Sequence, residues 1–174
     1  MKPFLIIALP RSMTAWMANW LTYSNCLCYH EGLETYGSLD ALIDKCKGGM
    51  LYGDSSPALS VTSSDEIIEK KDSFNIGYIE SDASESLESF KKVNPIPEKV
   101  SAETVINYSL MNIKKILKEV ECFTISKNDI FNADKLKEFT KNLCGQDLFN
   151  KDRFDMLTNI RVTQDIEKIA KQRI

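Results

Sequence analysis

Apolar residues near the start of the chain follow two patterns in succession, which together predict a strand that runs directly into a helix. Leu5–Leu9 is an unbroken apolar run, typical of a strand buried on both faces in a parallel sheet. Beyond Pro10-Arg11-Ser12, apolar side chains recur at helical spacing: Met13, Trp16, Met17, Trp20 and Leu21. We expect Ser12 to cap this helix and the rest of the chain to be arranged around the turn.

The same patterns continue along the chain. Further strands are predicted at Cys26–Tyr29, Phe74–Ile79 and Cys122–Ile125, with a short strand or extended turn at Met50–Pro57. Helical spacing predicts helices at 38–47, 63–71, 84–93, 101–120 and 133–143, and an amphipathic segment from Arg153. The longest helix has an apolar stripe of Ile106, Leu110, Ile113, Leu117 and Val120. Asn94–Pro97 is predicted to be a stiff connector, and the polar tail beyond Val162 is expected to fray.

These elements predict a three-layer α/β fold, with a mainly parallel sheet of about four or five strands and helices on both faces. The chain has 174 residues and no Gly/Ser/Pro-rich linker, so we expect one domain over residues 1–174. We interpret the first apolar run as a strand, because it is too short to span a bilayer and unlike a signal peptide, and we expect no membrane partner. The sequence does not indicate an oligomeric state.

Charge and cysteine content narrow the range of partners. The 22 basic and 25 acidic residues are mixed along the chain, without a long Lys/Arg tract, so nucleic acid is not an expected partner. Five cysteines, an odd number scattered through apolar contexts, favour reduced and mostly buried thiols in the cytoplasm. With only one histidine in the chain, a metal site is not expected.

The turn at Arg11 has the chemistry of an anion site. A strand that leads into a helix directs unpaired backbone N–H groups and the positive end of the helix dipole at the loop, and Arg11 adds a full charge. The alternative is an ordinary strand–turn–helix with a surface arginine. The G-x-x-x-x-G-K-[ST] pattern of P-loop NTPases does not occur, so ATP hydrolysis is the weaker hypothesis.

The segment Pro10-Arg11-Ser12-Met13-Thr14-Ala15-Trp16 resembles the phosphosulfate-binding loop of sulfotransferases, including small bacterial and phage members. That loop commonly reads Pro-(Lys or Arg)-Ser-Gly-Thr-Thr-Trp between the first strand and the first helix. The resemblance implies a P-loop-like fold and 3′-phosphoadenosine 5′-phosphosulfate as the cofactor. Its 5′-phosphosulfate would be held by Arg11, Ser12, Met13, Thr14, Ala15 and Trp16. In this chain Met13 replaces the glycine and Ala15 replaces the second threonine.

A second resemblance follows the strand at Phe74–Ile79. Sulfotransferases have Arg-Asp-Pro-x-x-x-x-x-Ser at this point, and the arginine and the later serine bind the 3′-phosphate. Ser81 stands at the arginine position and Ser89 at the serine position, among acidic residues such as Glu80 and Glu85. Ser81 cannot supply the charge of a guanidinium. Ser89 is alternatively a serine on the helix surface.

His30 and Glu31 follow the second predicted strand, where an open parallel sheet places its ligands. The ordinary pKa of a histidine suits a general base, whereas a lone histidine is often a packing residue. Small bacterial and phage sulfotransferase-like proteins often carry a His-Glu pair here, and related enzymes use a histidine or glutamate as the acceptor's base. The resemblance thus assigns catalytic roles to Arg11, His30 and Glu31.

Three further residues leave alternatives open. Asp54, in Gly-Asp-Ser-Ser-Pro, either holds Mg²⁺ or caps its own backbone in a turn, and we favour the turn. Arg153 and Arg161 either fold over a nucleotide or form surface salt bridges, which we favour.

The sequence therefore predicts a small sulfotransferase-like enzyme that transfers a sulfuryl group to an unknown hydroxyl acceptor, a small molecule or a protein. The alternatives are a non-catalytic nucleotide- or phosphate-binding module on the same fold and, with less support, a nucleotide kinase. Met13, Ala15 and Ser81 all depart from the sulfotransferase pattern in the direction of weaker cofactor contacts, which favours the binding module.

Overall fold

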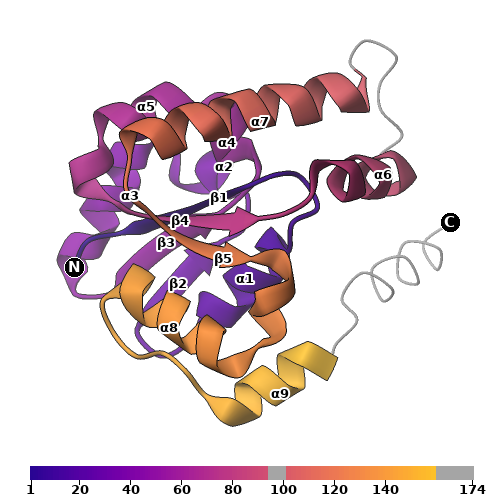
Figure 1. Cartoon of the computed structure of the whole chain (residues 1–174). Coiled ribbons are helices and arrows are strands. Elements are labelled where there is room, and N and C mark those ends of the chain that lie inside the picture. Colours follow the sequence, from indigo (N-terminus) through magenta and orange to yellow (C-terminus); the bar gives the residue numbers. More distant parts are fainter. Residues whose placement is uncertain (94–100, 160–174) are drawn as a thin grey trace, which may run out of the picture.

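A five-stranded parallel sheet forms the centre of the protein, as predicted (Figure 1). The computed structural model describes residues 1–93 and 101–159. The strands have the order β2-β3-β1-β4-β5 across the sheet. Their bounds are β1 Phe4–Ala8, β2 Cys26–Tyr29, β3 Leu51–Ser55, β4 Asn75–Glu80 and β5 Cys122–Ser126. The strand β1 pairs with β3 on one side and β4 on the other, and all five of its residues are buried.

Helices cover both faces of the sheet, which confirms the three-layer α/β architecture (Figure 1). One face is covered by α1 Thr14–Leu21, α8 Ala133–Cys144 and α9 Lys151–Asn159. The other is covered by α2 Leu33–Tyr36, α3 Leu39–Lys45, α4 Ala58–Thr62, α5 Ser64–Glu69 and α7 Ala102–Glu119. The helix α6 Ala83–Val93 follows β4 and packs against α7.

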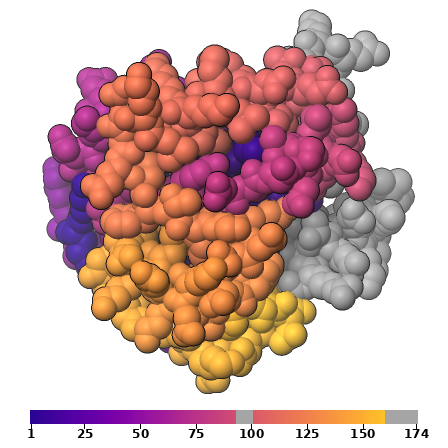
Figure 2. Space-filling model, viewed as in Figure 1, coloured from indigo at the N-terminus to yellow at the C-terminus, as the bar shows by residue number. Residues whose placement is uncertain are grey.

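Each face of β1 contributes to a separate hydrophobic cluster. Phe4, Ile6 and Ala8 face the cluster under α1, α8 and α9, whereas Leu5 and Ile7 face the cluster under α7. This alternation is what a strand buried on both faces produces. Later segments cover most of the N-terminal segment in the space-filling view (Figure 2).

The structure departs from the sequence predictions at α2, at α4 and in the apolar stripe of α7. The helices α2 and α4 were not predicted, because four or five residues are too few to show a helical period. In α7 the stripe includes Ile116, which is fully buried, whereas Leu117 is 38% exposed.

The predicted connector Asn94–Pro97 and the tail beyond Val162 lie outside the described residues. No helix in the described part of the chain is long and apolar enough to cross a bilayer.

The connections from β1 and β4 leave the sheet toward opposite faces. The chain after β1 enters α1 on one face, whereas the chain after β4 passes through α6 to α7 on the other. Because β1 and β4 are adjacent and parallel and their connections go to opposite faces, their carboxyl ends mark the position where open α/β sheets bind ligands. The loop at Arg11 and the segment beginning at Ser81 meet at this point.

Candidate functional site

The loop after β1 has an unusual backbone. Arg11 and Met13 have φ values of 68° and 66°, in the left-handed region that non-glycine residues rarely adopt, and Ser12 between them does not. Alternation of this kind turns successive N–H groups into one concavity that binds anions. Each left-handed residue costs about 1–2 kcal/mol, and strain of this kind tends to lie at functional sites.

The N-terminus of α1 begins at this loop without a side-chain cap. Met13 is the N-cap residue, and its side chain makes no capping hydrogen bond. The prediction that Ser12 caps the helix is wrong: its hydroxyl Oγ lies 2.5 Å from Ser81 Oγ. The left-handed residue at Met13 moves the start of the helix one position beyond the serine. The first N–H groups of α1 are therefore directed at the loop, and in the described part of the chain no side chain accepts from them.

Two side-chain contacts join this loop to the segment after β4. Arg11 Nε donates a hydrogen bond to Ser89 Oγ at 3.2 Å, and the fully buried Ser12 contacts Ser81. Ser81 precedes α6 and Ser89 lies within it. The structure thus brings together both serines and the loop, which the sequence grouped only through two separate motifs.

His30 reaches the same loop from the end of β2. Its Nε2 lies 3.3 Å from Thr14 Oγ1, in the first turn of α1, and either atom is able to donate depending on the tautomer. His30 and Glu31 are both exposed, and Glu31 has a left-handed φ of 55°. Within the described residues, no hydrogen bond joins the Glu31 side chain to the loop. Of the two residues, His30 is the one in contact with the anion loop, residues 10–14.

Trp16 lies mainly in the hydrophobic core. Its ring is 5% exposed, and its indole N–H donates to the carbonyl of Leu157 at 3.1 Å. Phe131 packs edge-on against it, with the ring centres 5.8 Å apart, and is 49% exposed. Phe131 was not predicted as a site residue. A single aromatic residue after a strand does not reveal from the sequence whether its ring is exposed. Ala15 is half-buried in the first turn of α1.

Asp54 does not lie in a turn, contrary to the sequence interpretation. It is a fully buried residue of β3, and its Oδ2 accepts hydrogen bonds from Tyr36 Oη at 2.7 Å and from the Gly32 N–H at 3.2 Å. Its Oδ1 is buried without a partner in the described part of the chain. Burial raises the pKa of Asp54, and the two hydrogen bonds oppose that rise.

A small hollow of about 140 Å³ adjoins Ser81 at the carboxyl ends of β4 and β5. Its walls include Glu80, Asp82 and Glu85, with Lys127 as a cation 3.2 Å from Glu85. Three carboxylates against one paired lysine make this a poor environment for an added phosphate.

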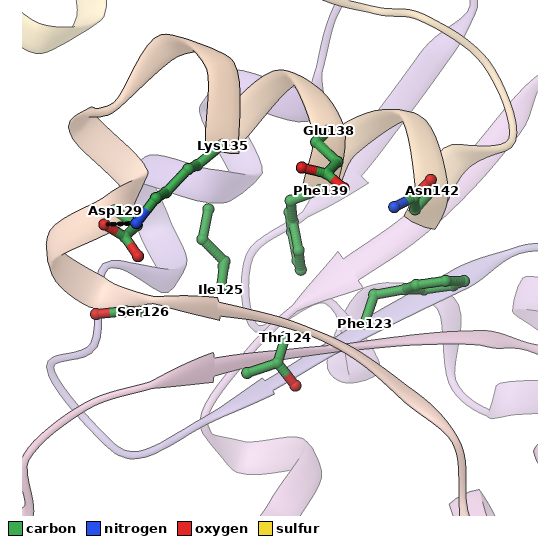
Figure 3. Close-up of a pocket in the computed structure, with 9 residues that line it drawn as sticks. All are labelled: Phe123, Thr124, Ile125, Ser126, Asp129, Lys135, Glu138, Phe139 and Asn142. Carbon is green, nitrogen blue, oxygen red and sulfur yellow. Dashed lines mark ion pairs between the residues drawn. The ribbon is translucent and has the colours of Figure 1, made fainter.

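A second hollow, of about 320 Å³, lies between β5 and α8 (Figure 3). Phe123, Ile125 and Phe139 form its apolar wall, and Lys135 lies 2.9 Å from Asp129 at its rim. None of the predicted site residues lines it.

Arg153 fits neither sequence interpretation. Its Nη2 donates to the carbonyl of Thr22 at 2.9 Å and to that of Asn19, and its guanidinium lies over the Tyr23 ring. It therefore satisfies carbonyls at the C-terminal end of α1, a favourable place for a cation. Arg161 lies outside the described residues.

The five cysteines are free thiols, four of them buried, as predicted. Among the described residues, no group of three or more His, Cys, Asp or Glu side chains is arranged to hold a metal ion.

A comparison with protein-family models and a search of curated proteins each found no match for this sequence. The site must therefore be interpreted from its own geometry.

Proposed function

We propose that the loop after β1 binds the 5′-phosphosulfate of 3′-phosphoadenosine 5′-phosphosulfate, and that the protein is a small sulfotransferase-like enzyme. The observation that carries this proposal is the uncapped N-terminus of α1, preceded by the alternating backbone of Arg11, Ser12 and Met13. This backbone offers an anion several N–H donors, the helix dipole and one guanidinium.

The remaining contacts support a nucleotide rather than a bare anion. The loop lies at the carboxyl ends of β1 and β4, where open α/β sheets bind ligands, and Phe131 offers a half-exposed aromatic surface beside the first turn of α1. An exposed ring suits stacking of a base. The fit to a 3′-phosphate is poor, because Ser81 has no charge and Glu80, Asp82 and Glu85 lie around it.

The bound cofactor would supply an activated sulfuryl group. The acceptor's hydroxyl oxygen would bond to sulfur as the bridging sulfur–oxygen bond breaks, leaving adenosine 3′,5′-bisphosphate. Arg11 and the N–H groups of α1 would stabilise the charge that develops on the leaving oxygen. His30 Nε2, the nitrogen directed at Thr14, would accept the acceptor's proton, and Glu31 is the alternative base.

A non-catalytic nucleotide-binding module is the second candidate function. It is favoured by Met13, whose side chain occupies a left-handed position where glycine would let the backbone approach phosphate closely. The carboxylates around Ser81 favour it as well. A helix N-terminus binds sulfate or phosphate passively, so an ion found in the loop would not distinguish the two candidates.

The test is calorimetric titration with adenosine 3′,5′-bisphosphate, AMP and ATP. We expect binding of the bisphosphate and of AMP, with Arg11→Ala weakening both by about ten- to a hundredfold through loss of a charge-assisted contact. Arg11→Lys should restore part of the affinity. Preference for ATP would favour a kinase, and no binding by the wild type at low salt would contradict the proposal.

Arg153→Ala is the matched control. Whereas Arg11 lies at the N-terminal end of α1, the Arg153 guanidinium lies at the C-terminal end of α1, where it contacts the carbonyls of Asn19 and Thr22. The substitution removes this guanidinium. We expect this variant to lose stability and keep its nucleotide affinity. Sulfuryl transfer to a panel of hydroxyl acceptors then separates the enzyme from the binding module.

A further inference from the structure

The turn that carries His30 and Glu31 is attached to the sheet through one buried carboxylate. Asp54 Oδ2 accepts from the Gly32 N–H and from the Tyr36 hydroxyl, so it joins β3 to the end of the turn after β2 and to the helix α2 that follows it. The register places Asp54 beside Tyr29, the last residue of β2. Asp54 is therefore paired with the residue that immediately precedes His30.

The local backbone leaves this turn little freedom. A Cβ added to Gly32 would lie 2.3 Å from Tyr29 Cβ, so only glycine fits there. Glu31 keeps a left-handed φ that a flexible turn would relax. Tyr36 is buried, and its ring packs 5.5 Å from that of Tyr29, which fixes the position of its hydroxyl. Removal of the Asp54 carboxylate would leave the Gly32 N–H and the Tyr36 hydroxyl without their acceptor.

We infer that Asp54 is a positioning residue, which holds the turn at His30–Gly32 so that the imidazole stays against Thr14 of the anion loop. The anion loop has its own attachments, Arg11 to Ser89 and Ser12 to Ser81, which do not involve Asp54. Asp54 thus acts on the acceptor's side of the site and leaves the anion's side unchanged. The inference rests on the proposed function to the extent that His30 serves the acceptor.

The test uses NMR, because His30 is the only histidine of the chain and its ring protons can be followed without ambiguity. In the wild type we expect cross-relaxation between these ring protons and the Thr14 methyl, and a protected Gly32 amide. Asp54→Ala should abolish the cross-relaxation and speed exchange of the Gly32 amide by about tenfold or more. Asp54→Asn keeps an acceptor oxygen and should restore both signals.

Thr140→Val is the control for lost stability alone. It removes the acceptor of the Trp20 indole N–H, at 3.0 Å, beneath α8 on the other face of the sheet. We expect it to destabilise the protein and to leave the His30 signals unchanged. If Asp54→Ala does not fold, Tyr36→Phe removes only the hydroxyl contact, and we expect weaker cross-relaxation and partial loss of Gly32 protection.

Cross-relaxation that persists in Asp54→Ala, or that is lost equally in Thr140→Val, would overturn the positioning role. Bisphosphate affinity distinguishes this failure from failure of the proposed function. Asp54→Ala should bind adenosine 3′,5′-bisphosphate within about twofold of the wild type, because the contacts of Arg11 with Ser89 and of Ser12 with Ser81 do not involve Asp54. A wild type that does not bind the bisphosphate would overturn the proposed function, and the NMR series would still decide what holds the turn.

Discussion

Two turns at the carboxyl edge of the sheet meet at the contact between Thr14 and His30, and they are held in different ways. The turn after β1 is attached by Arg11 and Ser12 to two serines of the β4–α6 segment. The turn after β2 is attached to the neighbouring strand β3 by hydrogen bonds to the buried carboxylate of Asp54. A bound anion is able to compete for the guanidinium of Arg11, whereas a ligand does not reach Asp54. The comparison indicates an adaptable turn after β1 and a fixed turn after β2.

The largest expected effect is a loss of stability caused by a substitution within the turn after β2. Gly32→Ala places a Cβ 2.3 Å from Tyr29 Cβ, and we expect destabilisation of about 3 kcal/mol or more, measured by urea unfolding. Gly48→Ala is the matched control, because nothing lies within 4 Å of its added Cβ. That variant should be neutral or stabilised by about 0.4–1 kcal/mol. Equal effects of the two substitutions would show that the turn after β2 is not tightly held.

A smaller effect concerns strain in the anion loop. Because Met13 has a left-handed φ, Met13→Gly should be more stable than Met13→Ala by about 1 kcal/mol in thermal unfolding, the reverse of the usual order in helices. The alanine variant is the control for loss of the methionine side chain, which packs against the core. An alanine variant that is equally or more stable would mean that Met13 is not strained. We also expect Met13→Gly to bind bisphosphate more tightly than Met13→Ala.

The smallest effect is a pH dependence that arises from Asp54. Because burial raises its pKa, the folded protein retains a proton that the unfolded chain releases. The corresponding stability is fully present below the unfolded pKa, near 3.9, and is lost as pH rises through the folded pKa. The free energy of unfolding of Asp54→Asn should therefore rise relative to that of the wild type as the pH increases above about 4. Urea unfolding at several pH values measures it, and a constant or falling difference would contradict the expectation.

Patterns that extend over many residues could be predicted from the sequence. The strand β2 has the predicted bounds, and β1 and β4 differ from their predictions by one residue at each end, because short segments dominated by apolar residues mark buried strands. The helix α7 was found from its period, although which of Ile116 and Leu117 faces the sheet depends on packing that the period alone does not determine. The short helices α2 and α4 have no such pattern.

Within the candidate site, the sequence itself indicated the loop after β1 and, separately, His30, whereas Ser81 and Ser89 were assigned only through the resemblance to sulfotransferases. Arg11, Ser12 and Thr14 share one loop, so a single motif indicates them together. The contacts of Ser12 with Ser81 and of Asp54 with Tyr36 join segments that are far apart in the sequence. Asp54 was interpreted as a turn residue because Gly-Asp-Ser-Ser-Pro is typical of turns, whereas it is a buried residue of β3. Arg153 shows the same limit, since its partners are main-chain carbonyls of α1 that no side-chain pattern reveals.

The central place of β1 in the sheet has a consequence for synthesis on the ribosome. Phe4 pairs with Gly53 on one side and with Asn75 on the other, so the most apolar strand is made first and both its edges remain unpaired until much later strands emerge. At roughly 5–20 residues per second this interval lasts several seconds, during which an exposed apolar strand is prone to aggregate. The anion loop also acquires its serine partners only after β4 has joined the sheet, so a nascent chain that ends before Ser81 cannot yet bind its nucleotide in the proposed manner.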